Sequence, residues 1–202
     1  MELFLQRLVD GLSEGSIYAL IALGYTMVYG IINLINFAHG DLVMIGAFVA
    51  YFAAELLGAN FPLAIFLAML IPACLSVAIE RLAYRPLRNK PRLSALITAI
   101  GVSIFLENFP RMLPFIGPNY RPFPLLIPFK NFALPTGAAL NSIQIVNILV
   151  SIVLMVALTY IMHRTKVGRA MRAVSFNKDA ASLMGINVNR IIAVTFFLGA
   201  AL

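Results

Sequence analysis

The stretch Pro62-Leu-Ala-Ile-Phe-Leu-Ala-Met-Leu-Ile-Pro-Ala-Cys-Leu-Ser-Val-Ala-Ile-Glu80 decides the fold, because its only charged side chain is the glutamate at its end. About 20 mostly apolar residues are enough to cross the hydrocarbon core of a bilayer as one helix. Residues 81–92 follow at once with four arginines and a lysine. Lys and Arg gather in the short cytoplasmic loops of membrane proteins, so this stretch predicts a transmembrane helix that ends at the cytoplasmic surface.

Four further apolar stretches have the length of a membrane span, and they occupy residues 15–32, 36–57, 94–112 and 142–162. A sixth begins near Ile191 and stops at Leu202. A helix over so few residues is too short to cross a bilayer, so we expect this chain to be the N-terminal part of a longer protein. The pattern predicts an all-α membrane protein, a polytopic transmembrane helix bundle with residues 1–202 in a single domain.

The composition excludes a soluble globular domain. Apolar residues make up 61% of the chain and charged residues 11%, against about 25% charged residues in ordinary soluble domains. The net charge of +7 does not indicate a nucleic-acid-binding face, because eleven of the fifteen Lys and Arg residues fall within residues 81–92 and 163–190. We therefore expect membrane lipid around the protein and no nucleic acid on it.

The two basic segments also predict the orientation of the helices. Residues 81–92 and 163–190 both belong on the cytoplasmic side, and the two spans between them agree with that parity. The loop at 113–141 then lies outside, as does the N-terminus if 36–57 crosses fully. Prolines at this density exclude a regular helix in the loop and favour an extended cap. The six prolines are Pro114, Pro118, Pro122, Pro124, Pro128 and Pro135.

Polar residues stand at the head of the second apolar stretch, where Asn36, His39, Gly40 and Asp41 precede an apolar run. Such groups are costly in hydrocarbon unless they face protein or water. We therefore expect a discontinuous second helix, with a break at Gly40 and a helix that starts near Asp41 and is capped by its carboxylate. Discontinuous membrane helices often line substrate paths. These residues and Asn33 form the candidate translocation path.

Two interpretations of this cluster stay open. His39 and Asp41 either contact the substrate or its hydration water, or they hold the broken helix in position through bonds to neighbouring backbone. For Asn33 and Asn36, hydrogen bonds between helices are the expected role.

Residues 163–190 form a second informative segment, because this basic loop has an amphipathic pattern. We expect one apolar face made of Ala170, Val174, Ala181 and Met184, with three cations left in solvent at Arg169, Arg172 and Lys178. Asn177 or Asp179 can cap a short helix that Gly185 ends. A loop of this kind is suited to docking a partner. Alternatively, Arg169 and Arg172 hold it at anionic lipid headgroups.

A resemblance appears at this point. Asp179-Ala-Ala followed by Gly185 resembles the cytoplasmic EAA…G coupling loop of bacterial ABC importer permeases, with Asp in place of Glu, although the Ile and Leu-Pro that continue that pattern are absent. The stretches 15–30, 35–48 and 168–190 resemble the branched-chain amino acid permeases of the same superfamily, in the H type of the two permeases of leucine/isoleucine/valine importers. The likeness covers nearly the whole chain.

The resemblance implies a permease subunit of an ATP-driven ABC importer for branched-chain (hydrophobic) amino acids, in the bacterial cytoplasmic (inner) membrane. It implies three kinds of protein partner: two cytoplasmic ATP-binding subunits, a second and related permease subunit, and a periplasmic or extracellular substrate-binding protein. ATP and Mg would be held by the ATPase, so this chain is expected to hold no cofactor. The implied ATPase-coupling residues are Arg169, Arg172, Asn177, Asp179, Ala180, Ala181 and Gly185.

Two other classes of function agree less well with the sequence. A channel or secondary transporter that uses no ATP, for urea or amides, explains the apolar helices equally well but not the coupling loop. An intramembrane enzyme is disfavoured, because Asp41, Glu55 and Glu107 have no motif spacing and the chain has only two histidines. We expect neither a catalytic residue nor a metal ligand.

Two acids are expected to form local ion pairs. Glu80 stands at the start of the first basic segment, next to Arg81 and five residues before Arg85, and either can be its partner. Glu107 stands four residues before Arg111, the spacing of a helical ion pair.

Overall fold

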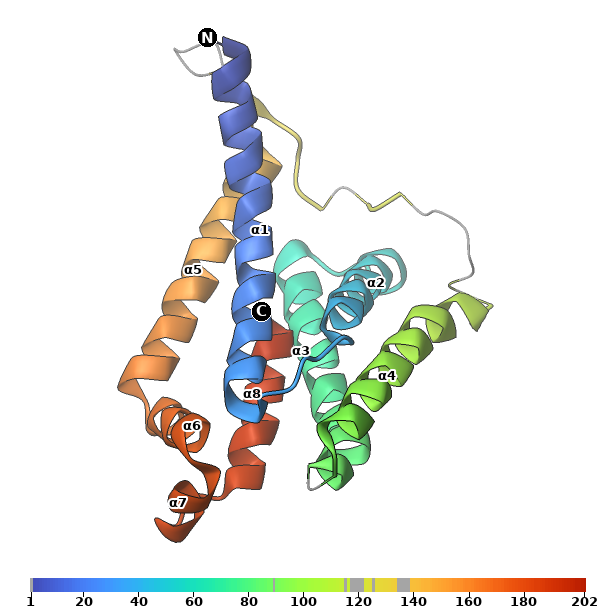
Figure 1. The fold of residues 1–202 in the computed structure, drawn as a ribbon. Coiled ribbons are helices and arrows are strands. Elements are labelled where there is room, and N and C mark those ends of the chain that lie inside the picture. The colour runs from blue at the N-terminus through green and yellow to red at the C-terminus, as the bar shows by residue number, and fades with distance from the viewer. Residues whose placement is uncertain (1, 89, 115, 117–121, 125, 134–138) are drawn as a thin grey trace.

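The computed structural model describes residues 2–88, 90–114, 116, 122–124, 126–133 and 139–202, and within them it is a bundle of helices (Figure 1). The helices are α1 (Glu2–Ile32), α2 (His39–Leu57), α3 (Phe61–Ile79), α4 (Arg92–Met112), α5 (Ser142–Arg164), α6 (Lys166–Phe176), α7 (Lys178–Leu183) and α8 (Val188–Ala201). A π-helical turn, η1 (Glu80–Tyr84), and a 3-10 turn, η2 (Arg85–Leu87), extend α3.

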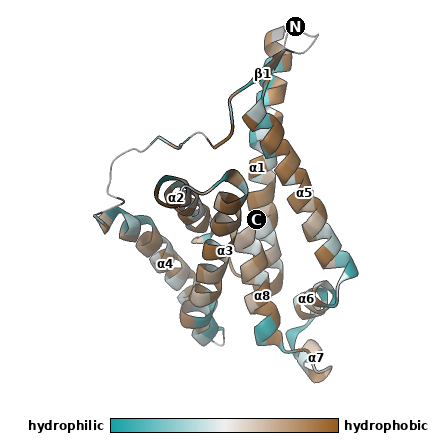
Figure 2. Cartoon of the chain, turned by 180° about the vertical axis from the view of Figure 1, so that it is seen from behind, coloured by the Kyte–Doolittle hydropathy of each residue, from teal (hydrophilic) through white to brown (hydrophobic). Residues whose placement is uncertain are grey.

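Five of these helices are long and apolar enough to cross a membrane, which confirms the predicted spans. They are α1, α2, α3 with its two turns, α4 and α5. Figure 2 shows hydrophobic residues along their length and hydrophilic ones near their ends. The first helix starts at Glu2 rather than near residue 15, and α8 is a shorter apolar helix.

The two basic segments lie at one end of the bundle, which we call the basic end (Figure 1). It holds η1, η2, α6 and α7, whereas the N-terminus and the end of α4 lie at the opposite end. This arrangement agrees with the parity predicted from charge. Of the six loop prolines, Pro118 and Pro135 lie outside the described residues.

A short hairpin closes the opposite end and was not predicted. Strands β1 (Asn131–Ala133) and β2 (Ala139–Asn141) pair antiparallel. The amide of Gln6 on α1 donates to the backbone oxygen of Ala139 at 3.1 Å and accepts from its N–H at 2.8 Å. The side chain of Gln6 therefore ties α1 to the edge of the hairpin.

Helices α1 and α8 cross in close contact at two glycines. A Cβ atom on Gly24 would lie 2.4 Å from the backbone oxygen of Gly199, and one on Gly199 would lie 2.9 Å from that of Gly24. Small residues at a crossing let two membrane helices approach closely. The pair Gly11 and Gly15, whose spacing resembles such a motif, has open space around it here.

The main core lies toward the basic end, where α1, α4, α6, α7, α8 and η1 meet. Its buried members are Val28, Ile31, Tyr84, Ala99, Met171, Val174, Ala181, Ile191, Ile192 and Phe196. The short helices α6 and α7 thus share one apolar cluster with the spanning helices, and a movement of either is transmitted by packing rather than by a flexible tether.

Candidate translocation groove and docking helices

The break expected in the second helix lies before it. Helix α2 is continuous from His39 to Leu57, and Gly40 is within its first turn. The non-helical residues are 33–38, which Figure 1 shows leading from the end of α1 to the start of α2. Asp41 is not the cap, because the N-cap residue is Ala38, whose side chain has no oxygen to offer. The prediction of a break at Gly40 was therefore wrong by a few residues.

Asn33 ends α1 rather than bridging two helices. Its φ of 55° is left-handed, and its N–H donates to the backbone oxygen of Tyr29 at 2.8 Å. Asn is one of the few residues other than Gly that adopt this conformation readily. Its side chain is exposed, so the expected interhelical hydrogen bond is not its role here.

Asn36 does form a bond between distant elements. Its Oδ1 accepts from the hydroxyl of Tyr84 in η1 at 2.8 Å, and both residues are buried. Tyr84 in turn packs against Phe196 of α8, with ring centroids 5.7 Å apart. The non-helical segment is thereby fixed to the core of the basic end.

A groove of about 500 Å³ opens beside the start of α2. Three of the candidate path residues line it, namely Asn36, His39 and Gly40, whereas Asn33 and Asp41 do not. The opposite wall comes from α1 and contributes Tyr18, Tyr25 and Thr26. These three side chains were not among the predicted path residues, because their spacing on α1 is also that of ordinary interfacial packing.

His39 is the most unusual group of this groove. It is buried, and its Nδ1 atom has no hydrogen-bond partner among the described residues. The ring of Tyr25 meets it edge-on, with centroids 5.9 Å apart. Because a buried polar atom without a partner costs roughly 1–3 kcal/mol, this nitrogen has capacity for a bond that the described chain does not supply.

Asp41 faces a different neighbour. Its Oδ2 accepts a hydrogen bond of 2.5 Å from the hydroxyl of Ser103 on α4. A carboxylate in a membrane span needs such a partner, and the bond joins α2 to α4. Asp41 thus bonds to a side chain of another helix rather than to neighbouring backbone, and its role in the path stays a prediction.

Helices α6 and α7 form the amphipathic segment that was predicted. Thr165 caps α6 through a bond of 3.1 Å from the N–H of Gly168. Asn177 caps α7 through a bond of 2.9 Å from the N–H of Ala180. The cap is therefore Asn177 and not Asp179. Gly185 follows α7 with a φ of +82° and ends the helix as expected.

The buried face of this segment differs from the prediction at one position. Val174 and Ala181 are buried and Ala170 is half-buried, but Met184 is 82% exposed. Met171, which was not predicted, is completely buried instead. The apolar side chains that project outward are Phe176 at 94%, Leu183 at 90% and Met184.

The cations of the segment also differ among themselves. Arg169 is exposed, as expected. Arg172 is exposed too, but its guanidinium donates to the backbone oxygen of Met162 and so braces the turn between α5 and α6. Lys178 is half-buried rather than solvated, and burial together with the charge of Arg88 lowers its pKa.

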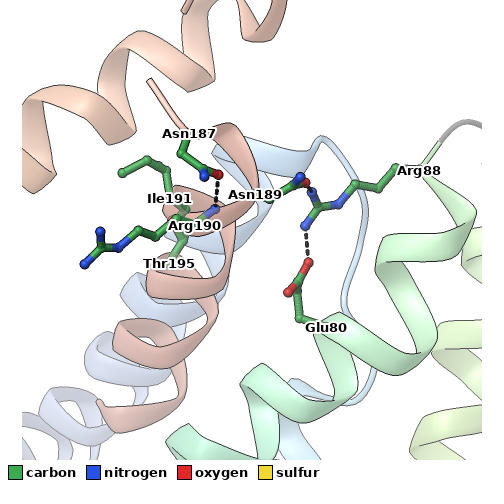
Figure 3. Close-up of polar contacts among 7 residues, drawn as sticks. All are labelled: Glu80, Arg88, Asn187, Asn189, Arg190, Ile191 and Thr195. Atoms are coloured by element: carbon green, nitrogen blue, oxygen red, sulfur yellow. Dashed lines mark hydrogen bonds and ion pairs between the residues drawn. The ribbon is translucent and has the colours of Figure 1, made fainter. Parts of the chain in front are cut away.

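The expected partners of Glu80 were wrong, because its carboxylate pairs with Arg88 rather than with Arg81 or Arg85 (Figure 3). Glu80 is only 1% exposed. The same guanidinium donates to Oδ1 of Asn189 on α8 at 2.7 Å, so Arg88 joins the end of α3 to the start of α8. By contrast, the Glu107–Arg111 ion pair is confirmed at 3.2 Å on the surface of α4.

Comparisons with known proteins show the family of the chain. The sequence profile of the family described as "Branched-chain amino acid transport system / permease component" matches residues 7–202. The chain belongs to this family. No solved structure matches it. Among the described residues, no three His, Cys, Asp or Glu side chains are grouped as metal ligands would be.

Three relatives show how far the likeness extends. The permease protein BraD of a high-affinity branched-chain amino acid transport system in Pseudomonas aeruginosa is 43% identical over 98% of this chain and 68% of its own length. The corresponding LivH of Escherichia coli K12 is 41% identical over the same shares. A probable LivH of Methanocaldococcus jannaschii is 27% identical over 93% of this chain and 60% of its own length. This chain is therefore a multi-pass transport permease.

Proposed function

We propose that this permease is the membrane subunit of an ATP-driven ABC importer for branched-chain amino acids, in the bacterial inner membrane with its basic end in the cytoplasm. Two ATP-binding subunits would dock at the basic end, and a substrate-binding protein would deliver the amino acid at the opposite end. A second, related permease subunit would complete the path. The ATP and Mg would be held by the ATPase, and no covalent chemistry would take place in this chain.

The observation that carries this proposal is the outward-facing apolar surface of α6 and α7. Phe176, Leu183 and Met184 are more than four-fifths exposed. They belong to or directly follow α6 and α7, which lie at the basic end and are not among the five candidate spans (Figure 1). Large apolar side chains that are exposed outside the spans support a contact with another protein.

The groove supplies the other half of the proposal. His39, Tyr25 and Asn36 provide a few polar groups among apolar walls, which suits an amino acid that carries a polar backbone and an apolar side chain. A path of this kind needs only two packings of the helices that differ by a few kcal/mol. Closure of the ATPase would select between them through α6 and α7.

Co-purification tests the docking surface. The permease is co-expressed with its candidate ATPase and partner permease, and the amount of ATPase retained in detergent is measured for wild type, Leu183→Glu and Leu183→Met. Burying a leucine contributes about 1.5–3 kcal/mol. Its replacement by a charged group should therefore weaken binding of the ATPase at least about 10-fold. Leu183→Met should retain it.

A charge at the other end serves as the matched control. Met112 is 80% exposed, close to the 90% of Leu183, but it is the last residue of α4 and lies at the opposite end of the bundle. Met112→Glu should therefore keep the ATPase bound. If wild type holds no ATPase, or if both glutamate variants lose it equally, the docking assignment fails and a carrier that uses no ATP becomes the better explanation.

A further inference from the structure

A second pocket, of about 510 Å³, lies at the basic end between the end of α3 and the start of α8. The part of the pocket nearest the basic end is polar. It contains three arginines, Arg81 and Arg85 from one wall and Arg190 from the other. Asn187 and Asn189 complete this part. The pocket is separate from the groove beside His39, since the two share no lining residue.

The positive charge of this pocket is not neutralised within the described chain. Glu80 is the only acid that lines it, and Arg88 already pairs with that carboxylate. No hydrogen bond or ion pair engages the guanidinium groups of Arg81, Arg85 and Arg190 among the described residues. Figure 3 shows the guanidinium of Arg190 pointing away from the Glu80–Arg88 pair. Three cations are therefore available to a ligand.

The part of the pocket farther from the basic end is apolar. Val77 on α3 and Ala193, Val194 and Phe197 on α8 line it. Both helices lead from here into the apolar body of the bundle (Figure 2). An anionic group that enters between the arginines therefore has a hydrophobic surface directly beneath it, on the side where the membrane lies.

We propose that this pocket binds one anionic phospholipid from the leaflet at the basic end, with its phosphate between Arg81 and Arg190 and the upper part of an acyl chain on Phe197. The planar guanidinium group matches the geometry of a phosphate in two parallel hydrogen bonds. The start of α8 adds a partial positive charge. A free phosphate ion would bind the arginines through the same phosphate group, but it has no acyl chain to contact the apolar half of the pocket.

Native mass spectrometry of the permease in detergent measures the binding. Phosphatidylglycerol and phosphatidylethanolamine are titrated separately, and inorganic phosphate is added as a competitor. Wild type should hold one phosphatidylglycerol in preference to phosphatidylethanolamine and keep it in phosphate. Arg81→Gln/Arg190→Gln removes one cation from each wall and should weaken phosphatidylglycerol binding about 10-fold or more, because both guanidinium groups that would hold the phosphate are lost.

Arg164→Gln/Lys166→Gln is the matched control, since it removes the same charge at the same end from two exposed residues outside the pocket. It should leave phosphatidylglycerol binding within about 2-fold of wild type. Phe197→Ala should weaken phosphatidylglycerol binding without changing any charge. An equal loss in both double variants would overturn the proposal in favour of diffuse surface charge. Displacement of the lipid by inorganic phosphate, or no preference between the two lipids, would overturn it as well.

Discussion

Gly24 sets the distance between α1 and α8, because the backbone oxygen of Gly199 lies where its Cβ would be. A side chain as small as a methyl group forces the helices apart. The same crossing holds Gly24 against the ring of His39, which is 3.1 Å from that Cβ position. One residue without a side chain therefore shapes both a helix contact and the wall of the groove.

Gly24→Ala should destabilise the permease. Overpacking costs about 1–3 kcal/mol, which lowers the Tm by roughly 2–10 °C in a domain of this size. Thermal unfolding followed by fluorescence-detected gel filtration measures the shift. The control is Gly15→Ala on the same helix, where the added Cβ meets no atom within 4 Å. It should leave the Tm unchanged or raise it slightly through helix propensity, and equal losses at both positions would contradict the close-contact explanation.

The ion pair of Glu80 gives a second prediction at this scale. Arg88→Met leaves a carboxylate that is 1% exposed without its partner, which costs about 3–5 kcal/mol. We expect a clear loss of Tm in the same measurement. Glu80→Gln/Arg88→Met removes the stranded charge and should recover most of that loss. Failure of the double variant to recover would mean that Arg88 acts through Asn189 instead.

At the scale of elements, the core connects α6 and α7 to the groove through η1. Met171 and Val174 of α6 share a buried cluster with Tyr84. The hydroxyl of Tyr84 then donates to Asn36, which lines the groove. The π-helical form of η1 fits such a role, since π-bulges are frequent at functional sites. A shift of α6 therefore reaches the non-helical segment 33–38 through contacts that are all buried.

Tyr84→Phe breaks this connection at one atom. The lost bond leaves Oδ1 of Asn36 without a partner, at a cost of about 1–3 kcal/mol. In a reconstituted transporter we expect leucine uptake to fall about 10-fold while the ATPase stays bound and hydrolyses ATP. Tyr160→Phe is the control, because that hydroxyl belongs to an exposed residue of α5. If uptake and hydrolysis fall together, Tyr84 supports folding rather than coupling.

For the whole molecule, α1 is longer than a membrane is thick. Its 31 residues span about 46 Å, against about 30 Å of hydrocarbon. The excess holds Gln6 and Asp10, and Asp10 accepts bonds of 3.0 Å from Gln6 and 2.8 Å from Gln144 on α5. We therefore expect the polar end of α1 and the hairpin to form a cap outside the bilayer.

The two ends should be distinguished by chemical labelling. In a Cys74→Ser background, Phe132→Cys lies in the hairpin and Ala180→Cys in α7, and both positions are exposed. A membrane-impermeant maleimide should label residue 132 in intact cells and residue 180 only after the membrane is opened, since basic loops face the cytoplasm. The reverse pattern would place α6 and α7 outside and remove the basis for ATPase docking there.

The sequence predicted the five spans because their length and apolar composition are local properties. It missed the start of α1, since Arg7, Asp10 and Glu14 lower its hydropathy without ending the helix. It missed Arg88 as the partner of Glu80, because a helical ion pair is expected at a separation of three or four residues and these two residues are eight apart. Met184 was misplaced because α7 ends at Leu183, so helical periodicity no longer applies to it.

The bond between Tyr84 and Asn36, two residues 48 positions apart, has a consequence for biosynthesis. At about 5–20 residues per second, a ribosome takes several seconds to travel from one to the other. The side-chain oxygen of Asn36 is therefore made before its partner, and we expect it to reach the membrane-insertion machinery in that state. We expect stalled chains in which Tyr84 is still inside the ribosome to crosslink to that machinery through position 36, and chains long enough to deliver Tyr84 to lose the crosslink as the first three helices pack together.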